Sequence, residues 1–382
     1  METSLAMNTL IFLGVAIIMV PLARKFGLSS VIGYIAGGII IGPYVLKLTG
    51  KDVNDIMHAS EFGVIMLLFL VGLELEPRKF WDMRKKIVGL GLTQMLLTIS
   101  LLFLVFIWAG WKIDKAIAVA MCFALSSTAI VLQTLQEKNN LKTLAGEASF
   151  STLLFQDIAV IPILAILPLI ANYKSRHHDN EIQVLIQTLP EWMQFATVIL
   201  GVVILILLGR YVFVPFLRYV SKSGMSELLT ASSLFLVIGV SELMVAIGLS
   251  PALGAFLAGV MLANSEFRYE LEAQIDPFKG LLLAVFFVSV GSTMNFNIIQ
   301  KDPTFIFTTV FAVLAIKFVV LFLIGKFFKI DTPQSLFYAF ALSQVGEFAF
   351  VLINYASSLY LLPSELNAQM MAVTAITMCI TP

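Results

Sequence analysis

Residues 123–130 read FALSSTAI and residues 340–347 read FALSQVGE, so the same four letters recur 217 positions apart. Two more matches follow in the same order along the chain. GYIAGGIIIGP from Gly33 is similar to GAFLAGVMLAN from Gly254 at an offset of 221, and Gly72 in LLFLVGLELE aligns with Gly291 in AVFFVSVGSTM at an offset of 219. Taken alone, the glycine motifs equally fit helix-packing faces. Three ordered matches at nearly one offset indicate instead that the chain consists of two related halves.

The composition indicates the environment of these halves. Of the 382 residues, 59% are hydrophobic and 13% are charged, whereas a soluble domain is about half apolar and about a quarter charged. We therefore predict an all-α polytopic membrane protein surrounded by lipid, and exclude an ordinary soluble enzyme. The sequence contains no nucleotide-binding loop, catalytic triad or basic–aromatic run, so we expect no enzymatic activity, no resident cofactor and no nucleic-acid partner.

Thirteen apolar stretches approach the roughly 20 residues that a membrane-spanning helix needs. The matched segments lie seven spans apart, and an odd separation reverses the direction through the membrane. Spans 1–6 and 8–13 are therefore predicted inverted repeats joined by span 7, an arrangement typical of secondary transporters with a midplane site at broken helices. The predicted spans are 8–23, 29–46, 59–76, 87–109, 115–136, 147–172, 191–218, 228–248, 250–265, 278–297, 304–327, 333–358 and 366–382.

The basic residues predict the orientation of these spans. Sixteen Lys and Arg residues fall in or beside the odd-numbered connections and seven in or beside the even-numbered ones. Because cytoplasmic loops carry the excess of Lys and Arg, we expect the N-terminus outside and the C-terminus in the cytoplasm. The N-terminus has no signal-peptide pattern, so we expect the first span to be retained. We interpret the last span, which stops at Pro382, as the end of a truncated chain.

Three ionisable residues fall within predicted spans, where charge is costly and usually functional: Asp157, Lys317 and Glu347. A structural Asp–Lys pair is one interpretation, but burying such a pair often costs more than its attraction returns. A carboxylate that binds a proton and a cation in turn fits better. The repeat also aligns Asp157 with Thr374 and Lys317 with Ser100, so each half contributes a different charge, as expected of a site.

The two FALS segments interrupt apolar spans with small and polar residues, which predicts locally unwound helices. Half-helix N-termini favour negative charge and C-termini favour cations, so at a crossing an Asp would neutralise the positive ends and a Lys or a bound cation the negative ones. Each hydroxyl in the first segment is either an ion ligand or a cap on its own backbone. The residues concerned are Ser126, Ser127 and Thr128 in the first segment and Ser343, Gln344 and Gly346 in the second.

Six strings carry a resemblance to a known family: GLELEP (72–77), LSSTAI (125–130), LLFQDIAVIP (153–162), GAFLAGVML (254–262), DPFKGLLLAVFFVSVG (276–291) and SQVGEFAFV (343–351). They resemble the monovalent cation:proton antiporter-2 family, and within it the Kef-type glutathione-regulated potassium efflux proteins, from Gly27 to the end of the chain. This resemblance implies a NapA/NhaA-like homodimer in the inner membrane, with 13 transmembrane helices and two crossed broken helices. It further implies a dimer scaffold at about 8–76 and 228–297, a linker helix at about 191–218, and a moving ion-transport core at about 87–172 and 304–382.

The resemblance also implies roles for individual residues. Asp157 would carry potassium or a proton, with Gln156 as its neighbour, Ser127 and Thr128 as ligands at the crossing, and Lys317 as the core lysine. We expect Lys317 to stabilise the core, together with Glu347, or to pair with Asp157 when the site is empty. The segment 269–276 resembles an acidic regulatory loop that contacts a cytoplasmic nucleotide- and glutathione-binding domain, which is absent from this chain; its acidic residues are Glu270, Glu272 and Asp276.

Potassium:proton antiport, with potassium efflux by alternating access, is the leading functional expectation. Similar electrogenic sodium antiporters have two adjacent acids where this chain has Gln156 and Asp157, which favours potassium over sodium. Sodium:proton antiport and a ligand-gated potassium channel stay open as alternatives. A sodium-coupled symporter of organic solutes is less compatible with the sequence, because the core offers few polar groups for such a substrate.

Overall fold

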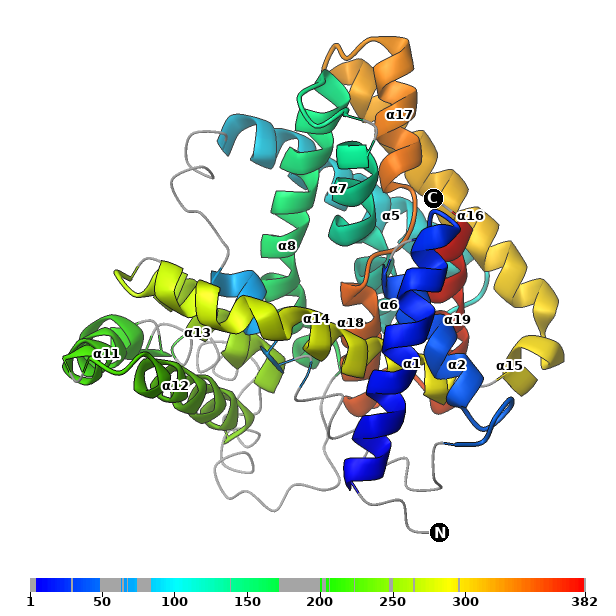
Figure 1. Cartoon of the computed structure of the whole chain (residues 1–382). Coiled ribbons are helices and arrows are strands. Elements are labelled where there is room, and N and C mark those ends of the chain that lie inside the picture. Colours follow the sequence, from blue (N-terminus) through cyan, green and yellow to red (C-terminus); the bar gives the residue numbers. More distant parts are fainter. Residues whose placement is uncertain are drawn as a thin grey trace. The chain divides into compact units, whose positions relative to one another are not determined.

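The structure is a computed structural model of the chain, and every regular element among its described residues is helical (Figure 1). The described residues are 5–28, 30–48, 63, 65–66, 68–73, 84–137, 139–171, 200, 204–205, 207–222, 224–246, 250–263, 265–294 and 296–380. The helices are α1 (Leu5–Lys25), α2 (Ser30–Ile41), α5 (Thr93–Trp108), α6 (Ile113–Ala124), α7 (Thr128–Glu137), α8 (Leu144–Ile170), α11 (Val214–Ser221), α12 (Ser226–Ala246), α13 (Pro251–Ala263), α14 (Arg268–Thr293), α15 (Phe296–Lys301), α16 (Pro303–Phe327), α17 (Thr332–Leu342), α18 (Phe348–Ser358) and α19 (Ser364–Ile380), with π-helical segments Ile87–Leu92 (η1) and Gly209–Phe213 (η2).

Most predicted spans correspond to these helices within a few residues. Among the described residues, four helices are long and apolar enough to cross a membrane by length and composition: Arg84–Trp108, Leu144–Ile170, Glu227–Ala246 and Pro303–Phe327. The predicted spans 115–136 and 333–358 are each divided into two helices by a short non-helical segment. Much of the predicted spans 59–76 and 191–218 lies outside the described residues, so the number of thirteen stays a prediction.

Local sequence explains where α16 begins. Asp302 precedes the helix, and its carboxylate accepts a hydrogen bond from the backbone N–H of Phe305 at 3.1 Å. Pro303 occupies the first helical position, where its missing N–H costs nothing. The helix then runs for 25 residues, enough to carry Lys317 to its middle.

The chain divides into two compact units, each built from separate stretches of sequence. One unit comprises Met1–Ile56, Phe80–Ile163 and Phe287–Pro382, and the other comprises Met57–Lys79 and Leu164–Phe286. The first unit contains both divided spans as well as α16 and α19, and the candidate site lies within it. The proposed division into scaffold, linker and core is a separate, functional prediction.

A close helix crossing at glycines is found in each unit, and the two crossings are related by the repeat. In the first unit, a Cβ added to Gly38 of α2 would overlap the Val288 carbonyl oxygen and lie 2.9 Å from the Cα of Gly291 in α14. In the second unit, a Cβ added to Gly72 would overlap the Phe256 carbonyl oxygen and lie 3.1 Å from the Cα of Gly259 in α13. The sequence alignment pairs Gly38 with Gly259 and Gly72 with Gly291. The same contact therefore occurs twice with the halves exchanged, as an inverted repeat requires.

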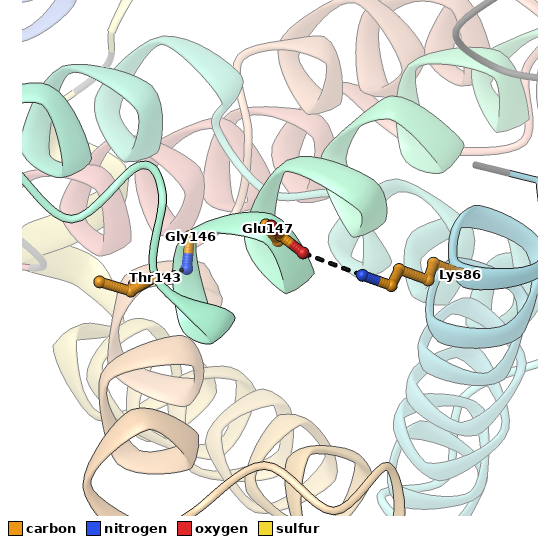
Figure 2. A network of polar contacts seen from close by, with 4 residues as sticks. All are labelled: Lys86, Thr143, Gly146 and Glu147. Atoms are coloured by element: carbon orange, nitrogen blue, oxygen red, sulfur yellow. Dashed lines mark hydrogen bonds and ion pairs between the residues drawn. The ribbon is translucent and has the colours of Figure 1, made fainter. Parts of the chain in front are cut away.

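Two exposed ion pairs repeat in a similar way within the first unit. Lys86, before η1, pairs with Glu147 in the first turn of α8 at 2.9 Å (Figure 2). Lys301, at the end of α15, pairs with Glu365 in the first turn of α19 at 2.6 Å. The two lysines are 215 positions apart and the two glutamates 218, close to the repeat offset. Each half thus links its fourth and sixth spans by a surface pair of the kind that contributes little stability.

Candidate functional site

The two divided spans break at the segments that the sequence predicts. α6 ends at Ala124 and α7 begins at Thr128, with Leu125 in an extended conformation at φ −73° and ψ 149°. α17 ends at Leu342 and α18 begins at Phe348. Serine favours such interruptions because its hydroxyl competes with the helical backbone for hydrogen bonds. Glycine favours them because, without a side chain, its backbone loses more conformational freedom in a helix. The prediction of two broken helices is confirmed.

The two breaks touch each other directly. The backbone N–H of Gly346 donates to the carbonyl oxygen of Leu125 at 3.1 Å. The hydroxyl of Ser126 donates to the carbonyl oxygen of Leu342 at 2.7 Å. A Cβ on Gly346 would lie 2.5 Å from the Ser126 carbonyl oxygen, so the crossing requires glycine at this position. Backbone groups that the broken helices leave without partners are thus paired across the crossing.

Lys317 satisfies the carbonyl ends of both broken helices. Its side chain is fully buried, and its Nζ donates to the carbonyl oxygens of Leu125 and Gln344, each at 2.6 Å. Both carbonyls lie at or just beyond a helix C-terminus, where the helix dipole favours a cation. Among the described contacts, the ammonium group binds these two carbonyls. Lys317 therefore lies where a cation neutralises the negative ends of the crossing.

Asp157 lies at the opposite kind of helix end. Its Oδ1 accepts a hydrogen bond from the Thr128 hydroxyl at 3.2 Å, and Thr128 is the first residue of α7. A carboxylate beside a helix N-terminus is stabilised by the positive end of the dipole. The neighbouring Ser127 uses its hydroxyl as a cap, because its Oγ accepts from the backbone N–H of Ile130 at 3.3 Å. Of the two hydroxyls, that of Thr128 faces the carboxylate.

A pair of buried glutamines holds the break of the first span. The Oε1 of Gln156 accepts from the backbone N–H of Ser126 at 2.8 Å, and its Nε2 donates to Gln94 Oε1 at 2.7 Å. The Nε2 of Gln94 donates to the carbonyl oxygen of Ala124 at 3.1 Å and to Thr98 Oγ1 at 3.1 Å. Gln94 and Thr98 are functional candidates that the sequence analysis missed. Two polar side chains one turn apart in the apolar stretch 87–109 were the available signal.

The remaining predicted residues of the second break lie close to the crossing. Ser343 Oγ donates to the Phe340 carbonyl oxygen of its own helix at 3.1 Å. The side chain of Gln344 is fully buried, and Glu347 immediately precedes α18, where it is partly buried. These residues share one unit with Asp157 and Lys317.

The predicted regulatory loop is a helix, which corrects the sequence analysis. Residues 269–276 form the first turns of α14, which begins at Arg268 rather than near residue 278. The segment contains good helix formers, Glu270 lies in the first turn, and Arg268 pairs with Glu272 one turn on at 3.8 Å. The side chain of Asp276 lies outside the described residues. The acidic segment belongs to the second unit.

Residues 11–382 match the family described as "Sodium/hydrogen exchanger, transmembrane". The chain belongs to the sodium/hydrogen exchanger family. The fold of this exchanger is similar to two structures of the sodium proton antiporter MjNhaP1 from Methanocaldococcus jannaschii. The structure at pH 8 has 16% sequence identity and a TM-score of 0.64, covering 97% of this chain and 93% of the other. The electron-microscopy structure has 15% identity and a TM-score of 0.65, covering 100% and 95%.

These similarities confirm the coarse predictions made from the sequence. The exchanger is an all-α, multi-pass membrane protein with an antiporter fold. Its family consists of transporters that exchange cations for protons, not of enzymes. The cation, the residues that bind it and any regulation are finer questions that the family leaves open.

Proposed function

We propose that this exchanger moves a monovalent cation against a proton by binding each in turn at Asp157. The observation that carries the proposal is the placement of this carboxylate, which lies at the N-terminus of α7 with its Oδ1 on the Thr128 hydroxyl. A broken helix leaves backbone dipoles and one acidic group at the same point, and a cation or a proton there satisfies the same oxygen atoms. Thr128 is the proposed second ligand.

Coupling follows from the cost of charge at this depth. A carboxylate without a bound proton or cation is expensive in a low-dielectric surrounding, so the empty, ionised carrier crosses the membrane least readily. The Lys317 ammonium donates to the Leu125 and Gln344 carbonyls, and we propose that it neutralises these negative helix ends throughout transport. Asp157 is the group whose bound proton or cation we propose to change during transport. Glu347, immediately before α18, is proposed to stabilise this core.

Potassium is the cation that we propose, and sodium is the second candidate. Gln156 is neutral and has its oxygen on a backbone N–H, so a single carboxylate faces the ion. A single carboxylate attracts a cation less strongly than two adjacent carboxylates, so it replaces less of the cation's hydration shell. This favours potassium, which is larger and less strongly hydrated than sodium. Sodium is favoured by the family description and by the similar fold of the sodium proton antiporter MjNhaP1.

The broader setting of the exchanger is also a proposal. The Kef-type resemblance supports a homodimer in the inner membrane, with the C-terminus in the cytoplasm and a regulatory domain acting on the acidic segment of α14. In this view 8–76 and 228–297 form the dimer scaffold, and 87–172 with 304–382 moves past it. Cross-linking of two copies through single cysteines in α1 or α12 tests the dimer.

The experiment for the function itself uses purified protein in proteoliposomes containing a pH-sensitive dye. An imposed pH gradient is challenged in turn with K⁺, Na⁺, Rb⁺ and Li⁺, and the rate of dye recovery is measured. Antiport predicts saturable recovery with a strict dependence on the cation. A ligand-gated channel predicts instead a cation current that is independent of the pH gradient, and that result would reject the proposal.

A further inference from the structure

α5 carries two fully buried polar side chains on an apolar helix. Gln94 and Thr98 are one turn apart, and neither is accessible to the surroundings. A buried amide without hydrogen bonds is costly, so a glutamine in this position needs partners. Gln94 has a partner for its oxygen and two acceptors for its amide group. The network is complete, which is the condition under which buried polar groups impose a single arrangement.

The two glutamines bind the α6 break on both of its sides. The extended Leu125 separates the carbonyl of Ala124 from the N–H of Ser126, and neither group continues a helix there. Gln94 donates to the Ala124 carbonyl oxygen at 3.1 Å, and Gln156 accepts from the Ser126 N–H at 2.8 Å. The hydrogen bond of 2.7 Å between the two amides joins these contacts into one bridge across the break.

The backbone fixes the direction of every hydrogen bond in this bridge. Ser126 offers an N–H, so Gln156 must present its oxygen to it and turn its amide nitrogen to Gln94. Gln94 must then accept with its oxygen, which leaves its own nitrogen for the Ala124 carbonyl and Thr98. An amide has one donor end and one acceptor end, so it suits both positions, whereas an apolar side chain of equal size suits neither.

The bridge also fixes the neighbouring pair of functional groups. Gln156 and Asp157 are adjacent on α8, and Ser126 and Thr128 are two residues apart at the break. Holding Gln156 against Ser126 therefore sets how far Asp157 Oδ1 lies from the Thr128 hydroxyl, now 3.2 Å. We propose that Gln94 is a positioning residue that keeps the Asp157 carboxylate at the N-terminus of α7. This inference rests on the proposed role of Asp157.

The test measures Na⁺ and K⁺ exchange by proteoliposomes containing Gln94→Met, which keeps the side-chain length but removes the amide. We expect the KM for the transported cation to rise about tenfold with a smaller change in kcat, the size of one lost hydrogen bond. Gln94→Glu, of the same size, keeps an acceptor for Gln156 but loses the amide donor to the Ala124 carbonyl, so it is expected to raise the KM at least as much as Gln94→Met. Leu97→Met, at an exposed position of the same helix, is the matched control.

Two results separate positioning from simple packing. If Gln94 acts through Gln156, the double variant Gln94→Met with Gln156→Met has the same KM as Gln156→Met alone.

If Gln94→Met does not fold, Gln94→Asn replaces it, because its amide is too short to reach Gln156. An unchanged KM in a folded Gln94→Met variant, or additive effects with Gln156→Met, would each overturn the inference. Exchange that survives Asp157→Asn would instead reject the proposed function, so the two failures are distinguishable.

Discussion

A close backbone contact at the crossing makes Gly346 sensitive to substitution. In Gly346→Ala the new Cβ would lie 2.5 Å from the Ser126 carbonyl oxygen and 2.6 Å from its carbonyl carbon. Both distances are well inside ordinary van der Waals contact, and the obstacle is backbone that no side-chain rotation can move. α18 must therefore shift away from the first break by close to an ångström.

The cost of that shift can be worked from the contacts it disturbs. Overpacking of a dense core costs about 1–3 kcal/mol. The displacement also breaks the hydrogen bond from the Gly346 N–H to Leu125, now 3.1 Å, which adds about 0.5–1.5 kcal/mol. We expect Gly346→Ala to destabilise the protein by about 2–4 kcal/mol and to abolish exchange, since the shift separates the two breaks.

The assay is thermal unfolding in detergent, followed by loss of the folded peak on size-exclusion chromatography. Gly239→Ala is the matched control, because a Cβ at this glycine of α12 meets nothing within 4 Å. Alanine is the better helix former, so the control should melt at the same temperature as the unmodified protein or slightly higher. Equal melting of the two variants, with exchange intact in both, would refute the described crossing.

Two further predictions concern lysines. Lys317→Met leaves the Leu125 and Gln344 carbonyls without their buried donor, so we expect a loss of about 2–4 kcal/mol in thermal unfolding, and an unchanged melting temperature would contradict the assigned contacts. The hydrogen bond from Lys301 to Glu365, and then the charge of that carboxylate, raise the pKa of Lys301 above 10.5. A lysine whose pKa is higher in the folded than in the unfolded state stabilises the folded protein at a pH below its unfolded-state pKa. This stabilisation is lost as the pH rises through its folded-state pKa. The small difference in melting temperature between unmodified protein and Lys301→Ala should thus persist at pH 9 and be lost only as the pH rises above 10.5, and a difference that vanished near pH 8 would contradict it.

The repeats and breaks were predictable because their physical causes are local. Four letters shared by the segments from Phe123 and Phe340 were sufficient to locate both broken helices. Lys317 was recognisable because a charged side chain in the middle of an apolar span is costly to bury and is therefore usually functional. Its partners were not predictable, because the sequence offered Asp157 as a counter-charge, whereas backbone carbonyls freed by the breaks compete for the same ammonium.

The residues that escaped prediction are neutral or belong to helix ends. Gln94 carries no charge, and its importance depends on where the Ala124 carbonyl lies in space, which spacing along the chain does not reveal. The acidic segment 269–276 was interpreted as a loop because charged residues are usual between spans. Its side chains are nevertheless strong helix formers, and α14 extends through them.

Exchange by Asp157→Asn tests the central claim most directly. Asparagine keeps the size of the side chain and an oxygen acceptor, but it can neither bind a proton nor neutralise a cation. Asp302→Asn is the matched control, because its exposed side chain caps α16 and asparagine also caps helices. In proteoliposomes, Asp157→Asn is predicted to lose cation-driven proton movement with K⁺ and with Na⁺, while it melts normally and Asp302→Asn exchanges normally. Coupled exchange retained by folded Asp157→Asn would contradict the account.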